Sequence, residues 1–256
     1  MHGRQSGGFA DGPGAAAAGD RRLWAARRTA VTDAGPLVLA ANIARFDHAW
    51  ENAVLPLLPE VESASIRKNR RAEDRCRRIL ARLLLAHGLR VLHGWELRQG
   101  LAAPRREPEG RPFVPGLDRG VSLSHSGRWA VCAVGGPGQA RVGVDVEEIR
   151  PLPVEDFGIV FTAGELRAIQ AHAVPHAELI RRWTIKEAVL KARGSGLLGD
   201  PLLVDTQGDG GSVQGEDFCW RHLHLDHDHW LTVAGTGPTG PTKLIFPELE
   251  WPCGPA

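Results

Sequence analysis

The chain has 256 residues, of which 43% are hydrophobic and 24% charged, a composition typical of a globular protein with a substantial core. Its 31 Lys and Arg residues nearly balance 30 Asp and Glu residues, and a net charge of +1 excludes recruitment of nucleic acid or membranes by the overall charge. The apolar runs are too short to span a bilayer, and the four scattered cysteines form no CxxC pair, which excludes zinc fingers and a disulfide scaffold.

Residues 1–35 form the first segment, where we expect a disordered tail. The segment holds seven Gly and nine Ala residues and few large apolar side chains, so folding would not offset the entropy lost on ordering. It contains no continuous apolar stretch of the kind found in secretory signals, and we therefore expect a cytoplasmic protein. The segment 248–256, rich in proline, is expected to form a second tail.

Between the tails, one pattern of strands and helices occurs twice. In the first half, residues 36–139, we expect a strand at 37–44, a long helix at 67–87 that ends near Gly88, and short strands at 95–99, 121–123 and 130–134. In the second half, residues 140–247, we expect a strand at 142–146, a helix that begins near Thr162, a long helix at 177–193, and strands at 219–225 and 230–234. The repetition predicts an α+β fold of two similar halves.

The strand at 142–146 carries the first candidate site. Val142, Val144 and Val146 alternate along it, so Asp145 and Glu147 share the opposite face. Two neighbouring carboxylates repel each other unless a cation lies between them, and Mg²⁺ prefers such oxygen ligands. An exposed edge strand with ordinary acidic residues explains the same spacing, so this pattern alone leaves both interpretations open.

The long helix at 177–193 carries a third acidic residue. Helical spacing places Glu187 on one stripe with Ile180, Trp183 and Leu190, where an unpaired carboxylate is costly. Lys191 lies one turn further, and an ordinary ion pair four residues apart is the simple alternative. That pair does not explain why the acid faces inward, whereas a site for metal and phosphate does.

Two more segments carry groups that suit a phosphate ligand. Ser124 and His125 lie at the end of a strand beside a glycine turn, where a purely structural turn is the alternative. Residues 66–90 contain nine Lys or Arg residues and two acids. We expect most of these arginines to face solvent, but Arg77 lies at the edge of the apolar stripe and could reach inward. Since exposed aromatic residues and a basic overall charge are missing, a local polyphosphate ligand fits better than nucleic acid. The arginines expected on the solvated face are Arg71, Arg75, Arg78 and Arg82.

In their order and spacing, these motifs resemble those of the 4′-phosphopantetheinyl transferases, specifically the larger, monomeric surfactin-type branch. The segments that carry the resemblance are 109–112, 122–129, 142–147, 161–165 and 183–191. The resemblance implies two similar α/β halves related by pseudo-twofold symmetry, with the active site between them.

The resemblance also implies a reaction. A member of this family transfers the 4′-phosphopantetheine arm of coenzyme A to a serine of an apo acyl or peptidyl carrier protein. The products serve polyketide, nonribosomal peptide or fatty acid biosynthesis, and adenosine 3′,5′-bisphosphate is released. The reaction depends on Mg²⁺, for which Mn²⁺ can substitute. The enzyme would act as a cytoplasmic monomer, with no nucleic acid or membrane partner.

Individual residues take roles from the matched motifs. Asp145, Glu147 and Glu187 match the metal ligands, and the catalytic groups would be Glu187 as the base together with Lys191 and His125. Family members often carry cations just ahead of the basic helix, whereas this chain has Glu62-Ser-Ala-Ser65 there. The coenzyme A contacts would come from Arg77, Arg106, Arg111, Ser124, His125, Asp145, Lys186 and Lys191.

Two rival functions belong to other classes. One is a non-catalytic module that binds coenzyme A or a carrier protein, and the other is a Mg²⁺-dependent phosphodiester hydrolase. The acidic residues are few for a hydrolase with two metal ions. For a transferase, we expect an acidic carrier protein to dock on basic groups near the cleft. The candidates for this docking surface are Arg150, Arg167, Arg181 and Arg182.

Overall fold

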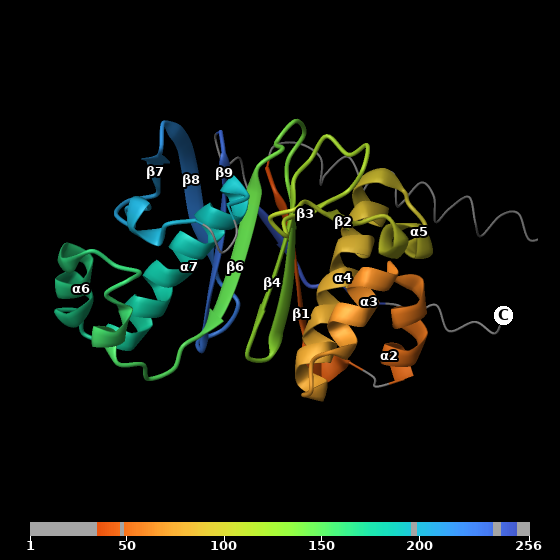
Figure 1. The fold of residues 1–256 in the computed structure, drawn as a ribbon, viewed down its shortest axis with the longest axis horizontal. Coiled ribbons are helices and arrows are strands. Elements are labelled where there is room, and N and C mark those ends of the chain that lie inside the picture. Colours follow the sequence, from red (N-terminus) through yellow and green to blue (C-terminus); the bar gives the residue numbers. More distant parts are fainter. Residues whose placement is uncertain (1–34, 47–48, 196–198, 238–241, 250–256) are drawn as a thin grey trace, which may run out of the picture.

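The computed structural model describes residues 35–46, 49–195, 199–237 and 242–249, and these form a mixture of strands and helices that is α+β in class (Figure 1). The first sheet has the order β10-β1-β5-β4, and only its β1–β10 pair is parallel. Its strands are β1 (Leu37–Asn42), β4 (Val121–Ser126), β5 (Trp129–Val134) and β10 (Lys243–Ile245). The second sheet is antiparallel and has the order β6-β9-β8-β7. Its strands are β6 (Val142–Glu148), β7 (Gly210–Val213), β8 (Glu216–Leu223) and β9 (His229–Thr236).

Helices cover the outer faces of both sheets. In the first half they are α2 (Ala49–Val54), α3 (Glu60–Arg67), α4 (Ala72–His93) and α5 (Leu97–Ala102). In the second half they are α6 (Ala163–Gln170) and α7 (Pro175–Arg193). A short two-stranded ribbon, β2 (Arg105–Arg106) and β3 (Pro112–Phe113), lies beside the first half. Single 3-10 turns occur at Ile43–Arg45, Leu55–Leu57, Val154–Phe157 and Pro201–Leu203. Within the described ranges, no helix is long and apolar enough to cross a membrane.

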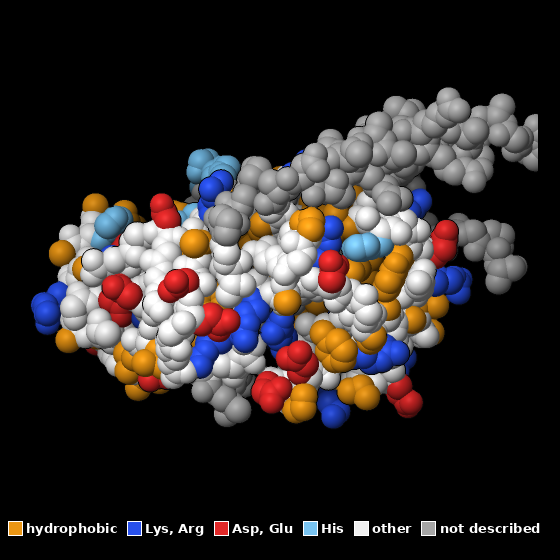
Figure 2. All heavy atoms as spheres, turned by 90° about the horizontal axis from the view of Figure 1, so that it is seen from above, with side chains coloured by type: hydrophobic (Ala, Val, Ile, Leu, Met, Phe, Trp, Pro, Cys, Tyr) orange, Lys and Arg blue, Asp and Glu red, His pale blue; other side chains and the backbone are white. Residues whose placement is uncertain are grey.

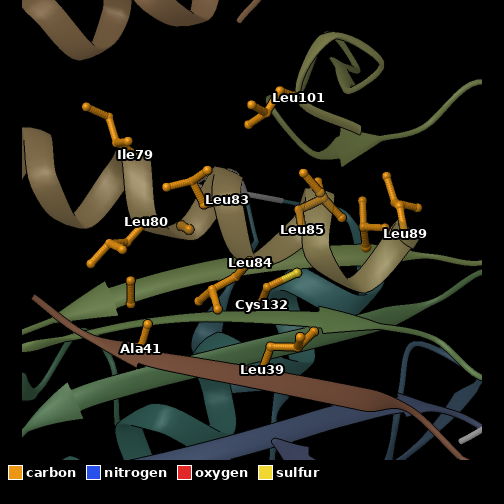
Figure 3. Packing of buried hydrophobic residues seen from close by; sticks show 14 of the residues in the cluster. Leu39, Ala41, Ile79, Leu80, Leu83, Leu84, Leu85, Leu89, Leu101 and Cys132 are labelled. Atoms are coloured by element: carbon orange, nitrogen blue, oxygen red, sulfur yellow. The ribbon is translucent and has the colours of Figure 1, made fainter. Parts of the chain in front are cut away.

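The core consists of layers. Leucines of α4 pack on one face of the first sheet, against residues such as Leu39 and Cys132 (Figure 3). A second layer lies between the sheets, where the valines of β6 meet Val38 and Val131. In the second half α7 packs on the outer face of its sheet, next to Phe218 of β8. The two long helices therefore lie on opposite sides of the paired sheets (Figure 1).

The two sheets meet along β4 and β6, and serine side chains join them. The backbone amides of Val144, Val146 and Glu148 donate to the hydroxyl oxygens of serines in β4, at 3.0, 3.4 and 3.2 Å. The serines that accept these bonds are Ser122, Ser124 and Ser126, respectively. Because successive side chains of a strand alternate in direction, every second residue of β4 faces β6. The polar edge of β6 is thus satisfied by hydroxyl groups rather than by backbone carbonyls.

The contact between β6 and α7 is unusually close. A Cβ atom added at Gly143 would lie 1.9 Å from the carbonyl oxygen of Ala188 and 2.5 Å from the amide nitrogen of Ala192. Both neighbours are backbone atoms, so only glycine lets the strand and the helix approach this far. This approach brings the acidic face of β6 against α7.

Most predicted elements are confirmed, and three predictions need correction. The strand expected at 37–44 ends at Asn42, where the chain enters a 3-10 turn. The long helix begins at Ala72 and runs past Gly88 to Gly94, which ends it with a φ of 71°. Gly88 is a packing residue, since a Cβ atom there would lie 3.2 Å from Leu39 and 3.3 Å from Val134. The strand expected at 95–99 is wrong, because helix α5 begins at Leu97.

In the second half, the strand at 142–146, the helix beginning after Thr162 and the long helix ending at Arg193 are confirmed. A capping box between Thr162 and Glu165 explains where α6 begins. The two final strands are confirmed as β8 and β9. Both predicted tails lie largely outside the described residues, which begin at Gly35 and end at Leu249.

Candidate active site

A cavity of about 310 Å³ lies along the junction of β4 and β6, between helices α4 and α7. One end is acidic and the other is rich in arginine. On the face shown in Figure 2, Lys, Arg, Asp and Glu side chains gather near the middle of the molecule. The residues that line the cavity are Glu62, Ile66, Arg78, Ala81, Arg82, Arg106, Pro112, Leu123, Ser124, His125, Asp145, Glu147, Glu187 and Lys191.

Asp145 is the centre of the acidic end and is 2% exposed. Its Oδ1 accepts hydrogen bonds from Lys191 Nζ at 2.6 Å and from Ser124 Oγ at 2.8 Å. Its Oδ2 is buried and has no hydrogen-bond partner. Burial raises the pKa of Asp145, while Lys191 and Ser124 oppose that rise. A buried carboxylate oxygen without a partner is costly, so Oδ2 of Asp145 has unused capacity to accept a hydrogen bond or to bind a cation.

Glu147 and Glu187 complete the acidic end. Ser126 Oγ donates to Glu147 Oε2 at 2.7 Å. Burial and the neighbouring charge of Asp145 raise the pKa of Glu147 to about 7. Burial also raises the pKa of Glu187, with Asp145 as the second cause. Negative charges this close repel one another, and a cation bound between them would relieve that repulsion.

The acidic end offers oxygen ligands of the kind that a hard metal ion prefers. Within the described residues, no three His, Cys, Asp or Glu side chains lie close enough together to form a ready metal cluster. The donor chemistry nevertheless fits a hard cation, because Asp145 and Glu147 share one strand face and Asp145 Oδ2 has no partner. Glu187 lines the same cavity from α7.

Two further side chains lie beside the acids: Lys191, which is cationic, and His125, which is neutral. Lys191 Nζ donates to Asp145, to Ser124 Oγ at 3.0 Å and to the Val144 carbonyl at 3.3 Å. The ion pair is therefore with Asp145 rather than with Glu187 four residues away. Burial, Lys191 and Arg77 lower the pKa of His125 to about 4, which keeps its ring neutral at pH 7 although part of the side chain is exposed.

The arginine-rich end is organised around a buried acid. Glu62 of α3 accepts a hydrogen bond from Arg82 Nη2 at 2.5 Å and another from Arg106 Nε. The side chains of Glu62 and Arg82 are 7% and 5% exposed, whereas that of Arg106 is 39% exposed. Arg78 donates to the carbonyl and the hydroxyl of Ser65, both at 3.2 Å. Three guanidinium groups thus face this end of the cavity, and one carboxylate lies among them.

Three predicted contact residues are not among the described residues that line the cavity. Arg77 donates to the Gly127 carbonyl at 2.5 Å and to Asp74 at 2.6 Å. Arg111 donates to the Ala140 carbonyl at 2.5 Å. Lys186 is fully buried and donates to Glu165 at 3.1 Å and to the carbonyls of Pro201 and Val204, a set of bonds that uses its whole ammonium group.

The structure brings seven predicted site residues together and adds others that the sequence pattern missed. The seven are Ser124, His125, Asp145, Glu147, Glu187, Lys191 and Arg106. Arg78 and Arg82 also line the cavity. The expectation that Arg82 faces solvent is wrong, because it is buried against α3, whereas Arg78 is half-buried. Glu62 and Ser126 were missed as well. The alternating serines of β4 were the available signal for Ser126, whereas Glu62 had none.

Comparison with known proteins gives consistent matches. A family model described as the 4′-phosphopantetheinyl transferase superfamily matches residues 141–234. The chain is 31% identical over 139 residues to a 4′-phosphopantetheinyl transferase of Bacillus subtilis, which covers 50% of this chain and 61% of that protein. It therefore spans less than two thirds of the length of this relative.

Longer alignments are found with eukaryotic proteins. A phosphopantetheinyl transferase of Thraustochytrium is 30% identical over 208 residues, with 69% of each chain covered. An L-aminoadipate-semialdehyde dehydrogenase-phosphopantetheinyl transferase of Eremothecium gossypii is 30% identical over 220 residues, with 78% of each covered. Among solved structures, holo-[acyl-carrier-protein] synthase of Thermotoga maritima matches at 19% identity with a TM-score of 0.30, over 38% of this chain and 62% of that one, which is too slight to carry an argument.

Proposed function

We propose that this chain, which belongs to the 4′-phosphopantetheinyl transferase superfamily, transfers the 4′-phosphopantetheine arm of coenzyme A to a serine of an apo acyl or peptidyl carrier protein. One observation carries the proposal: a single cavity joins an acidic end suited to a metal-bound diphosphate to an end with three arginines suited to further phosphate. The products would be the holo carrier protein and adenosine 3′,5′-bisphosphate.

Asp145, Glu147 and Glu187 would hold the Mg²⁺ ion, with Mn²⁺ as a substitute. When bound, the ion would neutralise charge that develops on the diphosphate oxygens. The orphaned Oδ2 of Asp145 and the raised pKa values of Glu147 and Glu187 support this assignment. A bound cation would also remove the repulsion between the acidic side chains and so stabilise the acidic end.

Glu187 would act as the base. The serine oxygen of the carrier attacks the phosphorus on the pantetheine side, a new P–O bond forms, and the bond to the other phosphate breaks. The serine proton passes to the Glu187 carboxylate, and the electron pair of the broken bond leaves with the nucleotide phosphate. A carboxylate whose pKa is raised is a stronger base at neutral pH, which supports Glu187 in this role.

Lys191, Ser124 and His125 would orient the acids and the diphosphate. Lys191 and Ser124 both donate to Asp145 Oδ1, which leaves Oδ2 without a hydrogen-bond partner and able to bind the ion. Neutral His125 at the cavity mouth has one ring N–H to donate to a phosphate oxygen. At the other end, Arg78, Arg82 and Arg106 would contact the nucleotide.

We also propose that the two halves, residues 36–139 and 140–247, are related by pseudo-twofold symmetry, with a nucleotide-binding side and a catalytic side. Residues 36–139 supply three strands of the first sheet, to which β10 of the second half adds a fourth, and residues 140–247 supply all four strands of the second sheet. Each sheet has a long helix on its outer face, which supports this division. The cavity is lined by residues from both halves. The thiols of Cys76, Cys132 and Cys219 are free, which supports a cytoplasmic location.

The docking surface for the carrier protein would centre on Arg150 and Arg167, both of which are exposed. Arg181 and Arg182 are poorer candidates than their positions in the sequence indicated. Both form ion pairs with the buried carboxylate of Glu178, at 2.6 and 2.7 Å, and so their guanidinium groups are already engaged.

The test is to incubate the protein with coenzyme A, Mg²⁺ and a panel of apo carrier proteins, and to weigh each carrier by mass spectrometry. A mass gain of one phosphopantetheine group on the serine is expected, and Glu187→Gln should abolish it while the exposed control Glu155→Gln should not. Binding without a mass gain would support the non-catalytic module, and hydrolysis of coenzyme A without a carrier would support the hydrolase.

A further inference from the structure

Glu62 is a buried acid in a place where the proposed function has no use for a negative charge. It lies at the arginine-rich end of the cavity, and each of its carboxylate oxygens accepts a hydrogen bond from a different guanidinium group. Arg82 binds Oε2, and Arg106 binds Oε1. A carboxylate repels phosphate and so weakens a phosphate site. Its presence here therefore needs a separate explanation.

A structural role for Glu62 explains its contact with Arg82 but not its contact with Arg106. Arg82 is 5% exposed, and a buried guanidinium needs a counter-charge. Arg106 has no such need, since it is 39% exposed and also donates to the Gly110 carbonyl at 2.7 Å. It nevertheless engages Glu62, with a second and longer contact of 3.4 Å from Nη2. A carboxylate and a phosphate present similar pairs of oxygens to the arginine fork, so they compete for it.

We propose that Glu62 is a specificity-determining residue of the nucleotide end, which holds Arg106 so that the 3′-phosphate of the ligand must compete with it for this guanidinium. The inference rests on the proposed function, because it assumes that a phosphorylated nucleotide occupies this end. Its consequence is quantitative: selectivity for a nucleotide with a 3′-phosphate over one without it is lower than three arginines alone would produce. Removing the carboxylate should therefore raise this selectivity.

The experiment measures binding of adenosine 3′,5′-bisphosphate and of adenosine 5′-monophosphate by calorimetry, without a carrier protein. In Glu62→Gln, the bisphosphate should bind about 10-fold tighter, as expected for loss of one nearby like charge, while binding of the monophosphate should change less than about 2-fold. The matched control is Glu60→Gln, which removes an exposed carboxylate from the same helix and should change neither affinity.

A second variant guards against loss of folding, because Glu62→Gln leaves Arg82 with less compensation. Glu62→Asp keeps the charge beside Arg82 and shortens the side chain by one methylene group, so that it no longer reaches both arginines. It should shift the selectivity in the same direction by a smaller factor. Unchanged or lower selectivity in the folded variants would overturn the role of Glu62 alone, whereas failure of the wild type to bind either nucleotide would overturn it together with the proposed function.

Discussion

Replacing Glu147 by glutamine should stabilise the protein at neutral pH in the absence of divalent metal. The pKa of Glu147 is raised from 4.5 to about 7 by burial and by the charge of Asp145. The folded state therefore binds the proton more tightly than the unfolded state does. The stabilising contribution of this carboxyl is complete below pH 4.5 and is lost as the pH rises to about 7.

The size of the effect follows from the two pKa values. At full burial the difference corresponds to about 3 kcal/mol. Because Glu147 is partly accessible to water, we reduce this figure to about 1–2 kcal/mol. Glutamine keeps the shape of the side chain and an oxygen that can accept the hydrogen bond from Ser126. At pH 8 the variant should therefore melt roughly 3–6 °C above the wild type, and at pH 4.5 the two should melt together.

The assay is thermal unfolding in EDTA between pH 4.5 and 8, followed by calorimetry. The matched control is Glu148→Gln, which removes the next carboxylate along the same strand. Its melting temperature should not gain on that of the wild type between pH 4.5 and 8. Addition of Mg²⁺ should reverse the advantage of Glu147→Gln, since the ion would stabilise the wild-type acids. A difference between Glu147→Gln and wild type that is constant with pH, or larger at acid pH, would refute the reasoning.

Three further predictions concern packing, chemistry and docking. Gly143→Ala should lower the melting temperature by more than roughly 10 °C, because the added carbon would overlap the Ala188 backbone, whereas Gly158→Ala, with open space around it, should have little effect. Glu187→Gln should lower kcat by about 10²–10⁴-fold, and a near-normal rate would exclude Glu187 as the base. Arg167→Glu should raise the KM for the carrier protein and leave that for coenzyme A unchanged; equal carrier KM values would move the docking surface elsewhere.

The acidic end of the site could be predicted from sequence because each signal was local. Alternation along one strand placed Asp145 and Glu147 on a common face, and helical spacing placed Glu187 inward. Both periods depend only on backbone geometry. The partner of Lys191 was not local: it pairs with Asp145 on another element and not with Glu187 one turn away.

The arginine-rich end shows what local patterns miss. Arg82 lies opposite the apolar stripe of α4, and in an isolated helix that face would be solvated. It is buried because α3 packs on it and supplies Glu62, a contact between residues 20 positions apart. Gly88 was misjudged for a related reason, since it ends no helix but lets α4 approach Leu39 and Val134. Lys186, expected in the site, is held by Glu165 on the far side of α7.

The serine joint between β4 and β6 also fixes the register of the two halves. A slip of one residue would place Leu123, His125 and either Val121 or Gly127 opposite the three β6 amides, which would lose their hydroxyl acceptors. A slip of two would put hydroxyls opposite only two of the three amides and would move Ser124 away from Asp145. Only one alignment satisfies the backbone and assembles the acidic end together. Because the same serines align the two halves and contact the acidic residues, the acidic end forms only when the halves are assembled in the correct register.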